Sequence, residues 1–393
     1  MSESAVLPDA RSPGWRFTPQ DALTRPRFAP AAPPAALTPL AGRVLCPVGF
    51  HRVALVNGRW ESAHALLDLP AGIRVESWRG EGGARGGAPA AAAGLGDQAF
   101  ACARDGVVVT VAAKVRADRP IHIVHVADAA DRAQISHARV MIRLERGARA
   151  EVIEEFVSFG EAPSWKNVFA RADLDEDAEL VHYRVLHDAA QGRTTYALDA
   201  ELGARARCES FLFQLGGAFA REDLHARLSG EGAQLGLSGL SLLRAGEVAD
   251  AHAVVEHSAV GGRTRHLHKA VLDESSRFVF EGLIHVHPGA QKTDAQVYNR
   301  NLILSETARV HSDPEFRIFA DDVSCRHGGA IGRLSAESLF YLRSRGVDEA
   351  EARRMLVYAF GAEMIERVGQ ESLREALSAA LRERMPEGRE ARA

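Results

Sequence analysis

The chain has 393 residues, of which 46% are apolar and 25% are charged, and its formal net charge is −4. This length suffices for two domains or for one elongated domain, and the charge gives no footprint for nucleic acid or an anionic membrane. No apolar run approaches the about 18 residues that a membrane helix requires, and residues 1–15 lack the pattern of a secretory leader. The sequence therefore predicts a globular protein that binds neither nucleic acid nor membrane.

The four cysteines, Cys46, Cys102, Cys208 and Cys325, are scattered and form no CxxC pair. Such usage fits a reducing cytoplasm and argues against a disulfide scaffold. A self-contained zinc or iron–sulfur site needs about four ligands. We therefore expect a cytoplasmic protein that, if it holds a cluster, shares the ligation with another chain.

The N-terminal part is predicted to contain little regular structure. Residues 1–36 are rich in Pro, Ala and Arg, which is typical of a flexible or extended tail. Residues 37–106 are predicted to form a small mixed segment with a Gly/Ala linker at 79–96. That linker contains neither the Gly-Lys-Ser/Thr of a P-loop nor a GxGxxG after a strand, so no ATP site is expected.

Residues 107–332 are predicted to form a succession of short strands. Apolar and polar residues alternate at period two, which indicates strands with one buried face. The absence of amphipathic helices between these runs excludes a doubly wound α/β fold. The runs are 107–111, 121–126, 139–144, 150–157, 179–186, 207–213, 236–243, 277–286 and 315–320.

Several of these runs begin with a turn residue followed by a small residue. The signature occurs at Gly147, Asp177, Gly203 and Gly232, and it recurs at intervals of 26–30 residues. Such a period is typical of a solenoid in which each repeat forms one coil. A β-sandwich also alternates strands with turns and stays open on periodicity alone, but the repeat favours a parallel β-helix.

Residues 333–393 are predicted to be helical. Ser335–Arg345 ends at Gly346, and the pattern of Asp348 and Glu351 predicts the start of a second helix. A third helix is expected over Glu371–Arg384. These helices are expected to form a separate cap that covers the open end of the β-helix and also offers a docking surface.

Cys325 and His327 form the most informative short pattern, just after the acidic pair Asp321 and Asp322. Side chains at i and i+2 point the same way along a strand, and thiolate and imidazole are both ligands for iron or zinc. By itself the pattern is weak, because a packed cysteine beside a structural histidine explains it equally well. The adjacent aspartates face opposite ways in a strand and are expected to close a turn.

Most of the sixteen histidines are expected to be inert. His285 and His287 share a strand side, as do His266 and His268, and we interpret such pairs as residues of a solvated β-surface. His257 and Lys269 are better candidates for a functional interior or interface.

A series of short blocks supports a more specific hypothesis. The blocks are Arg221–Asp223, Gly230–Ala233, His257, His268–Leu272, Gly282–Val286, Ala290–Asp294, Asn299–Leu302, Ala320–Val323, Cys325–Gly328 and Leu339–Gly346. In these blocks residues 221–368 resemble the SufB/SufD family of iron–sulfur cluster assembly proteins, in its SufD branch. The chain departs from the family at Gly329-Ala330, where Ala-Thr is more usual, and at Val297, where Gln is usual. From the same resemblance we expect the family's N-terminal helical region to be essentially missing here.

The resemblance implies a mainly β fold: a right-handed parallel β-helix core (107–332), a C-terminal α-helical cap and a small N-terminal mixed segment. It also implies a non-catalytic scaffold subunit that pairs with SufB and binds the SufC ATPase through about 335–385. His327, and second Cys325, are then candidate ligands of a transient [4Fe–4S] cluster shared with SufB. No catalytic residue is assigned.

Two other functions fit the sequence less well. A β-helix carbohydrate-active enzyme would use clustered aspartates and aromatic stacking residues, yet aromatic residues make up only 6% of the chain. A stand-alone metalloenzyme would need further ligands beside its His-x-His pairs, and the sequence does not supply them in a recognisable spacing.

Overall fold

The computed structural model describes residues 13–25, 27–33, 40, 42–46, 49–79 and 95–385. Most of the predicted linker at 79–96 and part of the predicted tail lie outside this range. The helices are η1 (Pro13–Trp15), α1 (Asp21–Thr24), η2 (Ser62–His64), α2 (Leu95–Cys102), α3 (Ala336–Ser344), α4 (Glu349–Ile365) and α5 (Glu371–Arg384).

The described residues also form twenty strands. They are β1 (Ala29–Pro30), β2 (His51–Val56), β3 (Arg59–Trp60), β4 (Ile73–Arg79), β5 (Asp105–Val111), β6 (Ile121–Asp128), β7 (Gln134–Leu144), β8 (Arg149–Phe159), β9 (Ser164–Leu174), β10 (Glu179–Leu186), β11 (Gly192–Leu202), β12 (Arg207–Gln214), β13 (Phe219–Leu228), β14 (Gln234–Leu243), β15 (Val248–His257), β16 (Arg263–Leu272), β17 (Arg277–Val286), β18 (Asp294–Ile303), β19 (Arg309–Ile318) and β20 (Ser324–Gly332).

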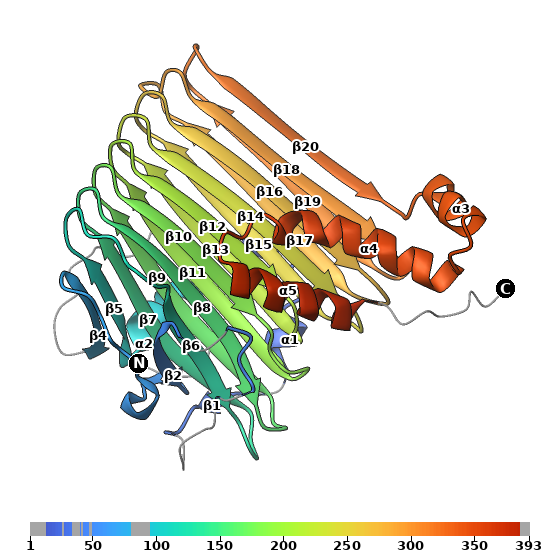
Figure 1. Cartoon of the computed structure of the whole chain (residues 1–393), viewed down its shortest axis with the longest axis horizontal. Coiled ribbons are helices and arrows are strands. Elements are labelled where there is room, and N and C mark those ends of the chain that lie inside the picture. Colours follow the sequence, from blue (N-terminus) through green and yellow to red (C-terminus); the bar gives the residue numbers. More distant parts are fainter. Residues whose placement is uncertain are drawn as a thin grey trace.

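The strands build two ten-stranded sheets between which the chain alternates (Figure 1). The odd sheet runs in the order β19-β17-β15-β13-β11-β9-β7-β5-β4, with β1 paired to β7. The even sheet runs β20-β18-β16-β14-β12-β10-β8-β6-β2-β3. Pairing is parallel along both sheets apart from β4 with β5 and β2 with β3. This topology confirms the parallel β-helix and excludes the antiparallel sandwich.

One corner of each coil explains the sequence repeat. Gly147, Asp177, Arg205 and Gly232 have positive φ, and each N–H donates to a carbonyl of the next coil at 2.8–2.9 Å. The residue that follows is always an alanine with no exposed surface, because only a small side chain fits inside the corner. The third turn residue is therefore Arg205 and not Gly203 as the sequence pattern had it.

Side chains on the inner side of both sheets form one long core of Val, Ile, Leu and Ala. A second apolar cluster lies outside the even sheet, where α4 and α5 pack on the strands (Figure 1). Leu373, Leu377 and Leu381 of α5 are fully buried there. Lys269 on β16 also donates to Glu363 of α4 at 2.5 Å.

The position of these helices corrects one expectation. They are not a separate cap over the open end, because α4 and α5 turn back along the side of the β-helix and complete its outer core. Tyr183, Phe211 and Phe213 project from the even sheet and would face water without them. In the described part of the chain, the last coil, formed by β19 and β20, has no further strand at its outer edge. Among the described residues, no helix combines the length and apolarity required to cross a bilayer.

Candidate functional site on the last coil

Cys325 and His327 lie on β20, the outermost strand of the even sheet. They pair with Ala295 and Val297 of β18, two positions that face the core. Cys325 packs against that core, and the His327 ring lies 4.9 Å from the ring of Phe316 on β19. Both side chains therefore project to the inner side of the sheet, as the i and i+2 spacing predicts, about 6.6 Å apart along the strand.

The hydrogen bond of His327 decides which of its nitrogens can bind a ligand. Nδ1 lies 2.8 Å from the backbone oxygen of Pro314. A carbonyl oxygen only accepts, so Nδ1 carries the proton and Nε2 keeps its lone pair. Metal-binding histidines are typically held in this way, with one ring N–H committed to a carbonyl or carboxylate. His327 is exposed, so the Nε2 lone pair is within reach of an incoming ligand.

Cys325 is less ready to act as a ligand. Burial raises the pKa of its thiol, and the carboxylate of Asp294 raises it further, although a hydrogen bond from the Ala295 backbone opposes them. The thiol of the isolated chain consequently stays protonated at neutral pH. Because the thiolate is the form that binds metal, Cys325 ranks behind His327.

Among the strands of the described residues, both strands of the last coil have a neighbour on one edge only. Around the other edge Ile318 is 39% exposed, Phe319 60% and Ile331 54%. Exposed edge strands that carry large apolar side chains are typical of surfaces that another chain covers. The candidate ligands thus lie within a surface suited to an interface. Asp321 and Asp322 lie in the turn between β19 and β20, where the Asp322 carbonyl accepts from the Lys292 N–H.

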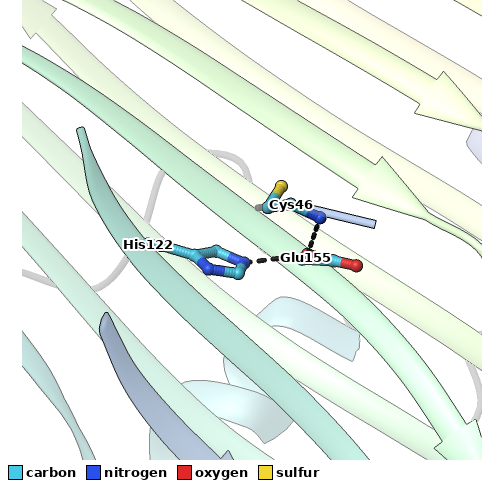
Figure 2. A group of neighbouring side chains, drawn as sticks. All are labelled: Cys46, His122 and Glu155. Atoms are coloured by element: carbon cyan, nitrogen blue, oxygen red, sulfur yellow. Dashed lines mark hydrogen bonds and ion pairs between the residues drawn. The ribbon is translucent and has the colours of Figure 1, made fainter. Parts of the chain in front are cut away.

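A second group of potential ligands lies far from the last coil. Cys46, His122 and Glu155 are buried, and one potential ligand atom of each lies within 4.8 Å of the others (Figure 2). Glu155 accepts from His122 Nε2 at 2.9 Å and from His187 Nε2 at 2.6 Å, and also from the backbone N–H groups of residues 45 and 46.

We interpret this second group as a structural hydrogen-bond network and not as a metal centre. Arg52 Nε donates to His122 Nδ1 at 3.0 Å, so the proton of the neutral ring is on Nε2, the nitrogen that a metal would need. Burial raises the pKa of the Cys46 thiol well above its usual value, and the negative charge of Glu155 adds to this. The group holds the incoming chain at Cys46 against β8. No local sequence pattern predicts this group, because its members come from three distant segments.

Other predicted functional residues have structural roles. His257 is buried and its Nε2 lies 2.9 Å from the Thr264 hydroxyl. Lys269 anchors α4, as described above. The expectation that His266 and His268 belong to a solvated surface is wrong, because both are buried inside the β-helix. Burial lowers the pKa of His266 to about 4 and that of His268 to about 3, where the charge of His266 also contributes.

The fold and this site define a parallel β-helix protein whose last coil presents a thiol and an imidazole with one unprotonated nitrogen. Residues 125–360 match the family model described as "SUF system FeS cluster assembly, SufBD core domain". The chain is 31% identical over 390 residues to the iron–sulfur cluster assembly protein SufD of Escherichia coli K12, covering 97% of this chain and 90% of that protein.

Two further relatives support the same conclusion. A SufBD family protein of Synechocystis (slr0076) is 28% identical over 94% of this chain and 86% of its own length. SufD of Bacillus subtilis is 26% identical over 69% of this chain and 62% of its own length. The chain belongs to the SufB/SufD family of iron–sulfur cluster assembly proteins, in its SufD branch.

Proposed function

We propose that this chain is the SufD-like scaffold subunit of a SUF complex. It pairs with a SufB-like subunit, binds a SufC-like ATPase and supports assembly of iron–sulfur clusters without catalysis of its own. Family membership supports the general role and disfavours a β-helix carbohydrate-active enzyme. The observation that carries the proposal is the geometry of His327. Its Nδ1 donates a hydrogen bond to the Pro314 carbonyl, while its Nε2 has a lone pair and lies on an exposed edge strand.

The nascent cluster is cargo in this proposal, and its ligands come from two chains. His327 offers one neutral nitrogen and Cys325 one thiol that must first lose its proton. Imidazole is a weaker donor to a reduced cluster than thiolate, so a site of this kind can release its product. We propose a transient [4Fe–4S] cluster at the interface with the SufB-like subunit.

Replacing His327 tests the site. In the complex purified with both partners, His327→Ala is expected to leave assembly intact, because one exposed imidazole contributes little to an interface of about 1,000 Å² or more. The iron and sulfide content of the complex should fall severely. In Cys325→Ser the iron and sulfide content should fall by the same amount if the thiol is a ligand. It should fall less if the thiol only packs against the core.

Arg326→Ala is the matched control, because Arg326 lies between the two candidates and is exposed on the other side of β20. It should retain full cluster content. Full cluster content in His327→Ala would overturn the site assignment, and loss of the whole complex would show that His327 is structural.

The surface of α3 supports the proposed contact with the ATPase subunit. α3 has no buried residue, and Phe340 and Tyr341 are 74% and 57% exposed. Because α4 and α5 are needed to cover the even sheet, deletion of residues 335–393 would confuse docking with folding. The double variant Phe340→Ala/Tyr341→Ala should instead abolish retention of the ATPase in a pull-down without lowering thermal stability.

Leu66→Ala serves as the control for α3, since Leu66 is 55% exposed and lies in the N-terminal segment. It should retain the ATPase fully. Retention by the α3 double variant at the control level would show that the ATPase docks elsewhere.

A further inference from the structure

A short N-terminal segment crosses the outer side of the odd sheet. This segment, Gly14–Thr18, is called the N-terminal strap below. It contacts three members of a row of in-register residues to which β13, β15, β17 and β19 each supply one side chain. The row is Arg221, Asp250, Val279 and His311. Neighbouring strands lie about 4.8 Å apart, so the row spans about 14 Å and reaches the last coil.

Both ends of the N-terminal strap are fixed to the inner coils. Trp15 is 5% exposed, and the guanidinium carbon of Arg221 lies 4.0 Å from the centre of its ring. Arg221 Nη1 donates to the Gly14 carbonyl at 2.8 Å and to the Asp250 carboxylate at 2.6 Å. The Thr18 hydroxyl also donates to Asp250. Because hydrogen bonds to charged groups are the strong ones, these contacts anchor the strap on β13 and β15.

The middle of the N-terminal strap contacts the last coil instead. The ring of Phe17 is stacked on that of His311 on β19, with centroids 3.5 Å apart and planes 19° apart. Three residues further along β19, the Pro314 carbonyl accepts the hydrogen bond from His327 Nδ1. Among the strands of the described residues, β19 pairs with β17 alone. Strands with few buried contacts open locally more easily than inner ones, so the Phe17 contact supports a weakly held strand.

We propose that the N-terminal strap holds β19 against the inner coils and that Phe17 is a positioning residue for His327. Opening of β19 away from β17 would carry the Pro314 carbonyl away from Nδ1 of His327. The strap opposes this movement, because Phe17 stacks on β19 while the residues on either side of it are anchored on β13 and β15.

The consequence for His327 is chemical. An imidazole without a fixed acceptor populates both neutral tautomers, and in one of them the proton occupies Nε2 and blocks its lone pair. By keeping the Pro314 carbonyl in place, the strap keeps the proton on Nδ1. The use of that lone pair for a cluster rests on the function proposed above, whereas the support of β19 by the strap does not.

Hydrogen exchange of the purified full-length chain, followed by mass spectrometry, tests the support of β19. In Phe17→Ala the amides of β19 are expected to exchange about two- to tenfold faster, the factor that corresponds to the loss of one aromatic stack. The amides of β10 should be unchanged, because that strand lies in the other sheet. Phe17→Tyr retains the ring and should restore the original rate in β19.

Phe28→Ala is the matched control. Phe28 also lies in the N-terminal part, but its ring packs edge-on against that of Trp165 on β9, with centroids 5.5 Å apart. This variant should leave exchange in β19 at the original rate. Equal acceleration of β19 in Phe28→Ala would show a general loss of stability and would overturn the proposal.

Nitrogen NMR of the imidazole rings tests the positioning of His327, whose signals are assigned by their loss in His327→Ala. The unmodified chain should show the proton on Nδ1, and Phe17→Ala should show a mixture of both tautomers that Phe17→Tyr reverses. The proposal is overturned if Phe17→Ala alters neither the exchange of β19 nor the tautomer, or if it alters only one of them. Both measurements use the single chain without iron, so their outcome is separate from the cluster content that tests the proposed function.

Discussion

The inner coils and the last coil have the same architecture, but a histidine at the same position of the coil is buried in one and exposed in the other. One row of the even sheet passes through His182, Ser210, Leu237, His266, Val297 and His327. His266 is covered by the following coils, and burial lowers the pKa of its ring to about 4. His327 is exposed, and no strand of the described residues follows β20 in the stack. Position in the stack, and not the strand pattern, separates an inert histidine from a candidate ligand.

The inner coils also contain charged groups that the last coil could not accommodate in the same way. Arg184 is buried inside the β-helix and donates to Glu222 at 2.6 Å and to the Ser210 hydroxyl at 2.9 Å. Glu154 lies 2.8 Å from Nε2 of both His125 and His182. Each charge there has partners within the chain. On the last coil, in contrast, the ion pair of Arg317 and Glu315 lies at the surface, with side chains that are 55% and 49% exposed.

The largest expected effect follows from the buried pair of Arg184 and Glu222. Arg184→Met leaves the Glu222 carboxylate buried without its cation, which should cost about 3–5 kcal/mol in the free energy of unfolding. Chemical denaturation measures this directly. The double variant Arg184→Met/Glu222→Gln should recover part of the loss. A single variant as stable as the unmodified chain would show that the interior tolerates an uncompensated charge.

A pair of apolar truncations sharpens the comparison between the two regions. Leu377→Ala, on the buried side of α5, should destabilise the chain by about 2–5 kcal/mol because it opens a cavity in the outer core. Ile331→Ala on the last coil, where the side chain is 54% exposed, should change stability by no more than about 0.5 kcal/mol. Equal losses in thermal and chemical denaturation would mean that the last coil is as tightly packed as the rest.

Period-two alternation could predict strands wherever one side was apolar, as in β10, β14 and β17. It failed for strands such as β9 and β13, whose outer rows mix Trp165, Arg221 and His225 with apolar residues. The outer side of these strands packs on N-terminal segments or carries paired charges. Its mixture of polar and apolar residues therefore shows no clear alternation in the sequence. Pairing between coils, which local patterns do not contain, determines those strands.

Only the part of the candidate site that lies within one strand could be predicted from the sequence. The spacing of Cys325 and His327 on one strand gave their common side, but the Pro314 carbonyl that fixes the tautomer of His327 comes from β19.

A third expected effect concerns the pH dependence of stability, and it comes from the inner coils. In the folded chain the pKa of His266 is about 4 and that of His268 about 3, whereas a histidine in the unfolded chain titrates near 6.5. Between these values the unfolded chain binds more protons, so the free energy of unfolding decreases as the pH falls below about 6.5. One such histidine lowers it by up to about 1.4 kcal/mol per pH unit, or about 2 kcal/mol by pH 5. Denaturation at pH 7, 6 and 5 should therefore show a slope that becomes shallower in His266→Leu and in His268→Gln. An unaltered slope in both variants would mean that other groups control the acid sensitivity. Burial by the following coils would then not be what keeps His266 and His268 uncharged in the folded chain.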